Sequence, residues 1–305
     1  MRVVRNADGA REQALRGCAF LLARRLMPIV GVEHGGVRYA ISTREAWGLG
    51  LSTFVYRVFD EETVCRMEKA LERHTEITTL NGLTILEVGA NIGTETVSML
   101  VRHGVERIVA VEPDPENVRF LRANLALNGV QDRVDIRQIA LSDADGMLML
   151  ERSADNSGDH RIRVATPSGP DLCNEEQRVA IAVPARSIDS LVDATQIDLG
   201  GIDLVWMDAQ GYEAHILTGA EGLGAAGIPV LTEYWPYGLR RVGALDRFHE
   251  LIAQRYGTVI DLRTGLDEPA VVLEAARVAE LAGRYVAQGR EDPHTPHTDL
   301  LLLPR

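Results

Sequence analysis

One short segment constrains the fold of this chain more than any other: residues 85–94, with the sequence ILEVGANIGT. It reads as a buried strand, a glycine turn and the start of a helix. Gly89 and Gly93 suit such a turn, because glycine lacks a Cβ atom and adopts positive φ angles that let a ligand approach the backbone. The segment therefore predicts an α/β sheet with a ligand at the carboxyl ends of its strands. A plain strand–turn–helix without a ligand is the alternative.

An acid ends the next predicted strand, residues 107–111, at Glu112. An acid about 20 residues after a glycine turn is placed to bind the ribose hydroxyls of a nucleoside cofactor. The glycine spacing differs from the G-x-G-x-x-G of dinucleotide enzymes, and Glu87 precedes the first glycine, where it would repel a pyrophosphate. A cofactor with a cationic end, such as S-adenosylmethionine, fits this pattern better than NAD.

Strands and helices alternate through the rest of the chain. We predict further core strands at residues 134–140, 203–207, 229–232, 258–262 and 300–303, and a late helix over 273–286. This alternation predicts a doubly wound, mostly parallel sheet. Two more strands, 147–151 and 179–183, flank a long polar stretch, so we expect an insertion around residues 152–180.

The first part of the chain carries no catalytic signature. We expect residues 1–80 to form a cap with an amphipathic helix over 11–26, a hairpin around Gly35-Gly36 and a helix near 61–73, and residues 81–305 to form the cofactor-binding domain. The helix over 11–26 is typical of a packing or dimer element, so a homodimer is possible.

Composition limits the partners. The chain has 305 residues and a net charge of −12, which disfavours a nucleic-acid substrate because phosphate binding needs clustered Lys and Arg. Cys18, Cys65 and Cys173 are few and scattered, as in a protein of the reducing cytoplasm. No apolar run reaches membrane-spanning length, so we expect no membrane partner.

Acids at strand ends are candidates for the reacting centre. Asp208 follows the strand at 203–207 and should lie beside the first glycine turn. There it would bind the cofactor amine, orient a hydroxyl or accept its proton; the alternative is a helix N-cap. Glu233 ends the next strand. A divalent ion shared by Asp208 and Glu233 stays open as an alternative, but two acids make a thin metal site, so we assign no metal. Ser142 and Asp143 would meet the adenine edge, or simply form a turn.

Five motifs in order resemble the FkbM family of S-adenosylmethionine-dependent methyltransferases. They are residues 87–93 (EVGANIG), 111–113 (VEP), 140–143 (ALSD), 187–191 (SIDSL) and 208–213 (DAQGYE), and the closing residues 298–303 (TDLLLL) also match. The resemblance spans residues 80–303. It implies the class I methyltransferase fold, with a seven-stranded sheet and a reversed last hairpin, and mostly O-methylation of sugars and natural-product hydroxyls.

Two positions depart from the family's common pattern: Trp206 stands where Lys is frequent and Gln210 where Glu is frequent. A sub-group has the Asp-x-Gln-Gly form followed by Glu-x-Trp-Pro, like residues 233–236 here. Any catalytic role of that Lys or Glu elsewhere in the family does not transfer to this chain.

The residues and the resemblance together give candidate sites. We expect cofactor binding by Glu87, Gly89, Asn91, Gly93, Glu112, Ser142, Asp143 and Asp208. We expect the proton acceptor to be Asp208, with His160 and Glu233 as alternatives. We expect the acceptor molecule to meet Asn156, His160, Arg161, Gln210, Tyr234 and Trp235, although the segment around 155–161 also reads as a solvated loop and the aromatic pair as a cover for the sheet end.

The leading hypothesis is an O-methyltransferase for an uncharged or cationic small molecule with a hydroxyl group, held without a Lys or Arg cluster. Two alternatives stay open: methylation of a peptide or protein, and a catalytically silent cofactor-binding subunit.

Overall fold

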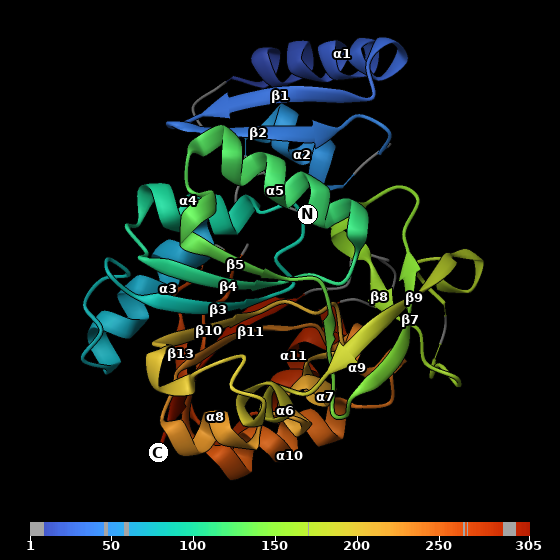
Figure 1. The fold of residues 1–305 in the computed structure, drawn as a ribbon. Coiled ribbons are helices and arrows are strands. Elements are labelled where there is room, and N and C mark those ends of the chain that lie inside the picture. The colour runs from blue at the N-terminus through green and yellow to red at the C-terminus, as the bar shows by residue number, and fades with distance from the viewer. Residues whose placement is uncertain are drawn as a thin grey trace.

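A large sheet forms the centre of the computed structural model, which describes residues 9–45, 48–57, 61–169, 171–264, 266, 268–288 and 297–305 (Figure 1). Its strand order is β13-β12-β14-β11-β10-β3-β4-β5. The strands are β3 (Thr84–Val88), β4 (Arg107–Val111), β5 (Val134–Arg137), β10 (Leu204–Met207), β11 (Val230–Tyr234), β12 (Tyr256–Asp261), β13 (Val271–Glu274) and β14 (Thr298–Pro304).

The pairing confirms the expected fold class. Strands β5, β4, β3, β10 and β11 are parallel neighbours, and β14 lies antiparallel between β11 and β12. This is a doubly wound sheet of the class I methyltransferase type with a reversed last hairpin. An eighth strand, β13, pairs antiparallel with β12 at the edge.

Two of the predicted elements were wrong. The helix expected over 273–286 begins only at Glu280, as α11 (Glu280–Gln288), because its first two residues, Leu273 and Glu274, continue from the β-branched pair Val271-Val272 as strand β13, which pairs with β12. The strand expected over 134–140 ends at Arg137. Its last residue, Ala140, instead begins β6 (Ala140–Leu141), which belongs to a second sheet.

The second sheet has the order β6-β9-β7-β8, with β7 (Gly146–Arg152), β8 (Arg161–Ile162) and β9 (Val179–Arg186). Figure 1 shows it standing beside the main sheet rather than continuing it. The connection from β7 to β9 carries β8 and two short 3-10 turns, at Ser157–Asp159 and Glu175–Gln177. This connection supplies one wall of the site.

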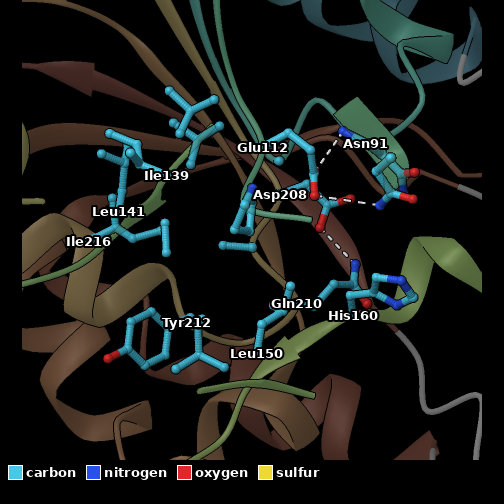
Figure 2. Close-up of a pocket in the computed structure, with 18 of the residues that line it drawn as sticks. Asn91, Glu112, Ile139, Leu141, Leu150, His160, Asp208, Gln210, Tyr212 and Ile216 are labelled. Carbon is cyan, nitrogen blue, oxygen red and sulfur yellow. Dashed lines mark hydrogen bonds between the residues drawn. The ribbon is translucent and has the colours of Figure 1, made fainter. Parts of the chain in front are cut away.

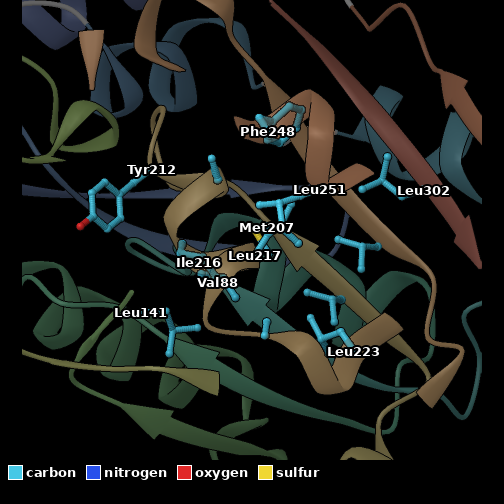
Figure 3. Packing of buried hydrophobic residues seen from close by; sticks show 14 of the residues in the cluster. Val88, Leu141, Met207, Tyr212, Ile216, Leu217, Leu223, Phe248, Leu251 and Leu302 are labelled. Atoms are coloured by element: carbon cyan, nitrogen blue, oxygen red, sulfur yellow. The ribbon is translucent and has the colours of Figure 1, made fainter. Parts of the chain in front are cut away.

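Helices cover both faces of the main sheet and bury two apolar cores. The helices of one face are α3 (Glu61–His74), α4 (Thr94–Arg102) and α5 (Pro115–Asn128), and those of the other are α6 (Ile188–Asp193), α7 (Glu213–Thr218), α8 (Glu221–Ala226), α9 (Pro236–Arg241), α10 (Leu245–Arg255) and α11. On the second face, Val88 and Met207 from the strands pack with Leu217, Phe248 and Leu251 from the helices (Figure 3).

The N-terminal elements form an outer layer: α1 (Ala10–Leu26), the hairpin β1 (Ile29–His34) and β2 (Val37–Ser42), and α2 (Leu49–Tyr56) lie over α4 and α5 (Figure 1). The Tyr39 hydroxyl donates to the Thr94 carbonyl at 2.8 Å, and Asn124 Oδ1 accepts the N–H of Ala40 at 2.7 Å. These bonds attach the hairpin to the helices of the main sheet. Within the described residues, no helix combines the length and apolarity needed to cross a membrane.

Candidate active site

A cavity opens at the carboxyl ends of β3, β4 and β10 (Figure 2). It encloses about 620 Å³ of empty space, part of it open solvent. One half is apolar and includes Ile139, Leu141 and Ile216. The other half is polar and includes Gly89, Asn91, Glu112, Asn117, Ser157, His160, Asp208 and Gln210. The cavity therefore suits a ligand with an aromatic or apolar end and a polar, hydrogen-bonding end.

The glycine turn brings two strand ends together. Gly89 has φ 87°, and a Cβ atom there would collide with the backbone oxygen of Asp208. Gly93 has φ 83° and begins α4, where a Cβ atom would press on the Leu121 side chain. Gly89 thus lies in the cavity wall and permits the close approach of β10, whereas Gly93 does not line the cavity and packs against α5.

Glu112 is held by the backbone in one orientation. Its Oε2 accepts the N–H of Asn91 at 2.9 Å, and its Oε1 accepts the N–H of Asp114 at 2.8 Å. Burial raises the pKa of the Glu112 carboxyl to about 7, against the lowering effect of these N–H donors. The carboxyl group is therefore fixed at the cavity wall, with both oxygens oriented before any ligand binds.

The polar half of the cavity fits a nucleoside cofactor. Asn91 has φ 50°, and its buried Oδ1 has no hydrogen-bond partner among the described residues. Its Nδ2 donates to the Ser157 carbonyl at 3.2 Å, which attaches the β7–β9 connection to the glycine turn. An orphaned acceptor beside an oriented carboxyl group is what ribose and amino groups of a cofactor would satisfy.

Glu87 lies beneath the glycine turn and does not line the cavity. Its side chain is 1% exposed, and Oε2 accepts the Thr96 hydroxyl of α4 at 2.6 Å. Burial raises the pKa of Glu87 to about 8, and the nearby charge of Glu112 adds to the increase. Glu87 therefore lies under the turn, where it is hydrogen-bonded to α4, and it is not positioned to contact a ligand in the cavity.

Ser142 and Asp143 follow the cavity-lining Leu141 but do not line the cavity themselves. The buried Ser142 hydroxyl donates to Asp143 Oδ1 at 2.9 Å and lies 3.3 Å from the hydroxyl of Tyr212, which does line it. The structure thus places both residues at the edge of the apolar half.

Three acids meet at the end of β10. Gln210 Nε2 donates to Asp208 Oδ1 at 2.7 Å and to Glu233 Oε2 at 3.3 Å. Glu213 joins them, so that oxygen atoms of Asp208, Glu213 and Glu233 lie within 4.8 Å of one another. Of these acids, only Asp208 lines the cavity.

The surroundings of this group favour the protonated forms of Glu213 and Glu233. Burial raises the pKa of Glu213 to about 7, and the charge of Asp208 contributes. Burial, followed by the charges of Asp208 and Glu213, raises the pKa of Glu233 well above its usual range. Glu213 Oε1 accepts two backbone N–H groups of the turn after β10, those of Ala209 at 2.9 Å and Gly211 at 3.2 Å. Three such carboxyl groups can also ligate a divalent cation.

His160 lines the cavity from the β7–β9 connection. Its Nδ1 accepts the N–H of Ser153 at 3.2 Å, so the neutral ring carries its proton on Nε2, which lies 4.0 Å from Asp114 Oδ2. Burial lowers the pKa of His160. The ring is therefore neutral near pH 7 and presents an N–H donor, and its only basic nitrogen is already hydrogen-bonded.

The other predicted acceptor residues are dispersed. Asn156 Oδ1 accepts the N–H of Leu49 at 3.1 Å and so joins the β7–β9 connection to α2. Tyr234 is fully buried, and its hydroxyl lies 2.8 Å from His249 Nε2. Trp235 is 7% exposed, and the Arg161 guanidinium lies 4.4 Å from its ring centroid. None of these side chains lines the cavity, and Arg161 lies at a second cavity beyond it.

Three residues that line the cavity, Asn117, Leu150 and Ile162, are not among the sequence-predicted site residues. Asn117 donates to Glu112 Oε1 at 3.5 Å and to the Ser157 carbonyl at 3.4 Å, but in sequence it reads only as the first turn of a helix. Leu150 and Ile162 come from the second sheet, whose pairing brings them to the cavity. Asn117 was within reach of prediction, because the helix that follows Glu112 must start at the same sheet edge.

Comparisons with known proteins agree with this geometry. Residues 87–233 match the family model described as the methyltransferase FkbM domain. The 2-O-methyltransferase NoeI of Sinorhizobium fredii (strain NBRC 101917 / NGR234) is 27% identical over 172 residues, which is 52% of this chain and 68% of that protein.

Two solved structures are also similar. The methyltransferase FkbM from Methylobacillus flagellatus KT has 16% identity and a TM-score of 0.42, covering 72% of this chain but 43% of the other. An O-methyltransferase from Bacillus cereus, solved with SAH, has 15% identity and a TM-score of 0.42, covering 79% of this chain and 80% of the other.

The strand order, the glycine turn with its paired Glu112, and the match over residues 87–233 agree. Residues 87–233 are similar to the methyltransferase FkbM domain, and the chain is an S-adenosylmethionine-dependent methyltransferase.

Proposed function

We propose that this methyltransferase transfers a methyl group to a hydroxyl of a small molecule such as a sugar or natural product. The observation that carries the proposal is the position of Asp208. Its carboxyl group lies in the cavity wall, beside Gly89 of the glycine turn and hydrogen-bonded to Gln210. The likeness to a protein named 2-O-methyltransferase supports a hydroxyl as the group methylated.

In this proposal the polar half of the cavity binds the cofactor. Glu112 accepts hydrogen bonds from the ribose hydroxyls, and Asn91 and the backbone at Gly89 bind the amino acid end. The apolar half, with Ile139 and Leu141, covers the adenine, while Ser142 and Asp143 bound its edge. Glu87 and Gly93 support the turn. When bound, S-adenosylmethionine supplies an electrophilic methyl group.

The remaining chemistry is positioning and proton removal. Asp208 is the proton acceptor of the proposal, because it is the one acid of the three-acid group that lines the cavity. Gln210 orients it through the 2.7 Å hydrogen bond. His160 donates its Nε2–H to an oxygen of the acceptor, since Nδ1 is already bonded to Ser153. Glu233 retains its proton and serves as a partner of Gln210.

The test is a transfer assay with labelled S-adenosylmethionine against separate panels of glycosides, macrolides, peptides and RNA. We expect label on hydroxylated small molecules and none on RNA, because the chain's charge of −12 opposes binding of a polyphosphate. Label on peptides or RNA alone would contradict the proposal. Binding of the cofactor with no transfer to any panel would instead favour a silent cofactor-binding subunit.

A further inference from the structure

A second cavity adjoins the first. It encloses about 680 Å³ of empty space including open solvent, between β8, the β7–β9 connection and α9. Gln210 and Ile162 line both cavities. The second cavity therefore begins where the first ends, one side chain away from Asp208, and a molecule seated in it could present a group to that carboxyl.

Arg241, the last residue of α9, has unused hydrogen-bonding capacity in this cavity. Its side chain is 7% exposed, and Nη1 donates to the Gly169 carbonyl at 3.0 Å. Its Nε and Nη2 make no hydrogen bond to any residue that the structure describes. They form ion pairs with Glu175 Oε1 and Glu176 Oε1, each 3.8 Å away, which is beyond hydrogen-bond length. A buried donor left in this way is costly unless a ligand or water satisfies it.

The other two arginines of the cavity, Arg161 and Arg163, are each hydrogen-bonded to an acid. Arg161 donates to Glu175 Oε1 at 2.6 Å and pairs with Asp159, and Arg163 donates to Glu151 Oε2 at 3.2 Å. Three arginines line this cavity: Arg161, Arg163 and Arg241. Three glutamates also line it, Glu151, Glu175 and Glu176, so formal charges of opposite sign are equal in number.

The equal numbers of arginine and glutamate side chains favour a neutral ligand over a charged one. A carboxylate or phosphate at Arg241 would lie against Glu175 and Glu176, which already face the same guanidinium. A neutral hydroxyl group avoids that repulsion, because it accepts from an arginine N–H and donates to a carboxylate at once. Neighbouring hydroxyls of a polyol that lies beside Arg241 and Glu176 can therefore bond to both side chains.

We propose that the second cavity is the acceptor subsite, and that Arg241 and Glu176 bind a neutral pair of neighbouring hydroxyl groups, as in a sugar ring. The inference rests on the proposed function, in which Asp208 accepts the proton of the reacting hydroxyl. A molecule bound in the second cavity would extend past Gln210, so that another of its hydroxyl groups reaches Asp208. Arg241 and Glu176 then determine which polyols bind, while Asp208 acts on the reacting hydroxyl.

The test measures binding and transfer separately. Binding of uncharged methyl glycosides with neighbouring hydroxyls, and of a methyl glucuronide, is measured by calorimetry in the presence of S-adenosylhomocysteine. The variants are Arg241→Gln and Glu176→Gln, and Arg240→Gln is the matched control, since Arg240 is the exposed preceding residue of the same helix. The Glu176 side chain is 73% exposed, so we expect Glu176→Gln to fold normally. This variant therefore tests the subsite even if Arg241→Gln does not fold.

We expect at least one uncharged glycoside to bind the wild type and Arg240→Gln alike, and to bind Arg241→Gln and Glu176→Gln about tenfold or more weakly. S-adenosylhomocysteine affinity should stay unchanged in all four proteins. Equal glycoside affinity in a folded Arg241→Gln and in Glu176→Gln, no glycoside binding by the wild type, or preferred binding of the glucuronide would each overturn the inference. Glycoside binding without methyl transfer would uphold the subsite and overturn the proposed function instead.

Discussion

Gln210 donates a hydrogen bond of 2.7 Å to Asp208, and the same amide nitrogen reaches Glu233 at 3.3 Å. An uncharged donor thus lies between two acids at the point where the two cavities meet. In the common pattern of the resemblance this position holds Glu, which would be a further acid in a group that already has three. Gln210 therefore orients Asp208 and limits the repulsion within the group.

Replacing Asp208 tests its assigned role as proton acceptor. Asp208→Asn keeps the shape of the side chain but removes its basicity, so we expect kcat to fall by about 10²–10⁴-fold, the usual contribution of general base catalysis. Affinity for S-adenosylmethionine and the midpoint of thermal unfolding should change little. A variant with near-normal kcat would reduce Asp208 to a structural role at the turn.

Gln210→Glu should destabilise the protein in a pH-dependent way. The substitution removes two hydrogen-bond donations and places a fourth carboxyl group beside Asp208, Glu213 and Glu233. We expect a lower unfolding temperature than wild type at about pH 8, above the pKa of about 7 of Glu213, and a smaller difference at about pH 6. Thermal unfolding at the two pH values measures this, with Gln177→Glu, outside the group, as the control. An equal loss at both pH values would contradict the charge argument.

Much of the fold was predictable because its signals are local. The strand–glycine turn–helix at residues 85–94 and the strand at 107–111 that ends before Glu112 each depend on neighbouring residues, and the structure has both. The start of α11 was not predictable in this way. Val271–Glu274 became a strand because β12 offers it a partner, which no short window of sequence contains.

The same distinction between local signals and tertiary contacts applies to the residues of the site. Residues that follow strand ends directly, such as Glu112 and Asp208, were predictable as cavity residues, because parallel strands bring their ends to one edge. Arg241 was not, since its position depends on how α9 packs against the β7–β9 connection. Tyr234 was expected at the acceptor but points into the core, where its hydroxyl meets His249.

Glu112 should be needed for cofactor affinity. Glu112→Gln removes the charge from the hydrogen bonds proposed to the ribose, which would cost about 1.5–3 kcal/mol, or about 10- to 150-fold in Kd. Glu116→Gln is a suitable control, because its side chain is 43% exposed and pairs with Arg152 at 2.8 Å. Calorimetric titration with S-adenosylmethionine gives both values. Equal affinities in the two folded variants would remove Glu112 from the cofactor site.

Glu87 should make stability fall as pH rises. Burial raises its pKa to about 8 in the folded protein, against an ordinary value near 4.5. Between these values the folded state keeps a proton that the unfolded chain has lost, so unfolding free energy decreases with rising pH and levels off above about pH 8. In protein without cofactor, Glu87→Gln should flatten this decrease by about 1 kcal/mol or more.

Urea unfolding of the wild type and Glu87→Gln at about pH 5 and about pH 8.5 measures the difference. The glutamine oxygen can still accept the Thr96 hydroxyl, which bonds Glu87 at 2.6 Å, so a loss of packing should not obscure the result. Parallel pH dependence in the two proteins would show that Glu87 does not titrate in this range.

Identification of the bond formed on the acceptor tests the central claim most directly. The purified enzyme is incubated with S-adenosylmethionine carrying an isotopically labelled methyl group and with hydroxylated small molecules, and the product is examined by mass spectrometry and NMR. The account predicts one added methyl group in an ether linkage to a former hydroxyl oxygen, formed by the wild type and not by Asp208→Asn. A labelled methyl group found on nitrogen or carbon, or an ether formed equally well by Asp208→Asn, would contradict it.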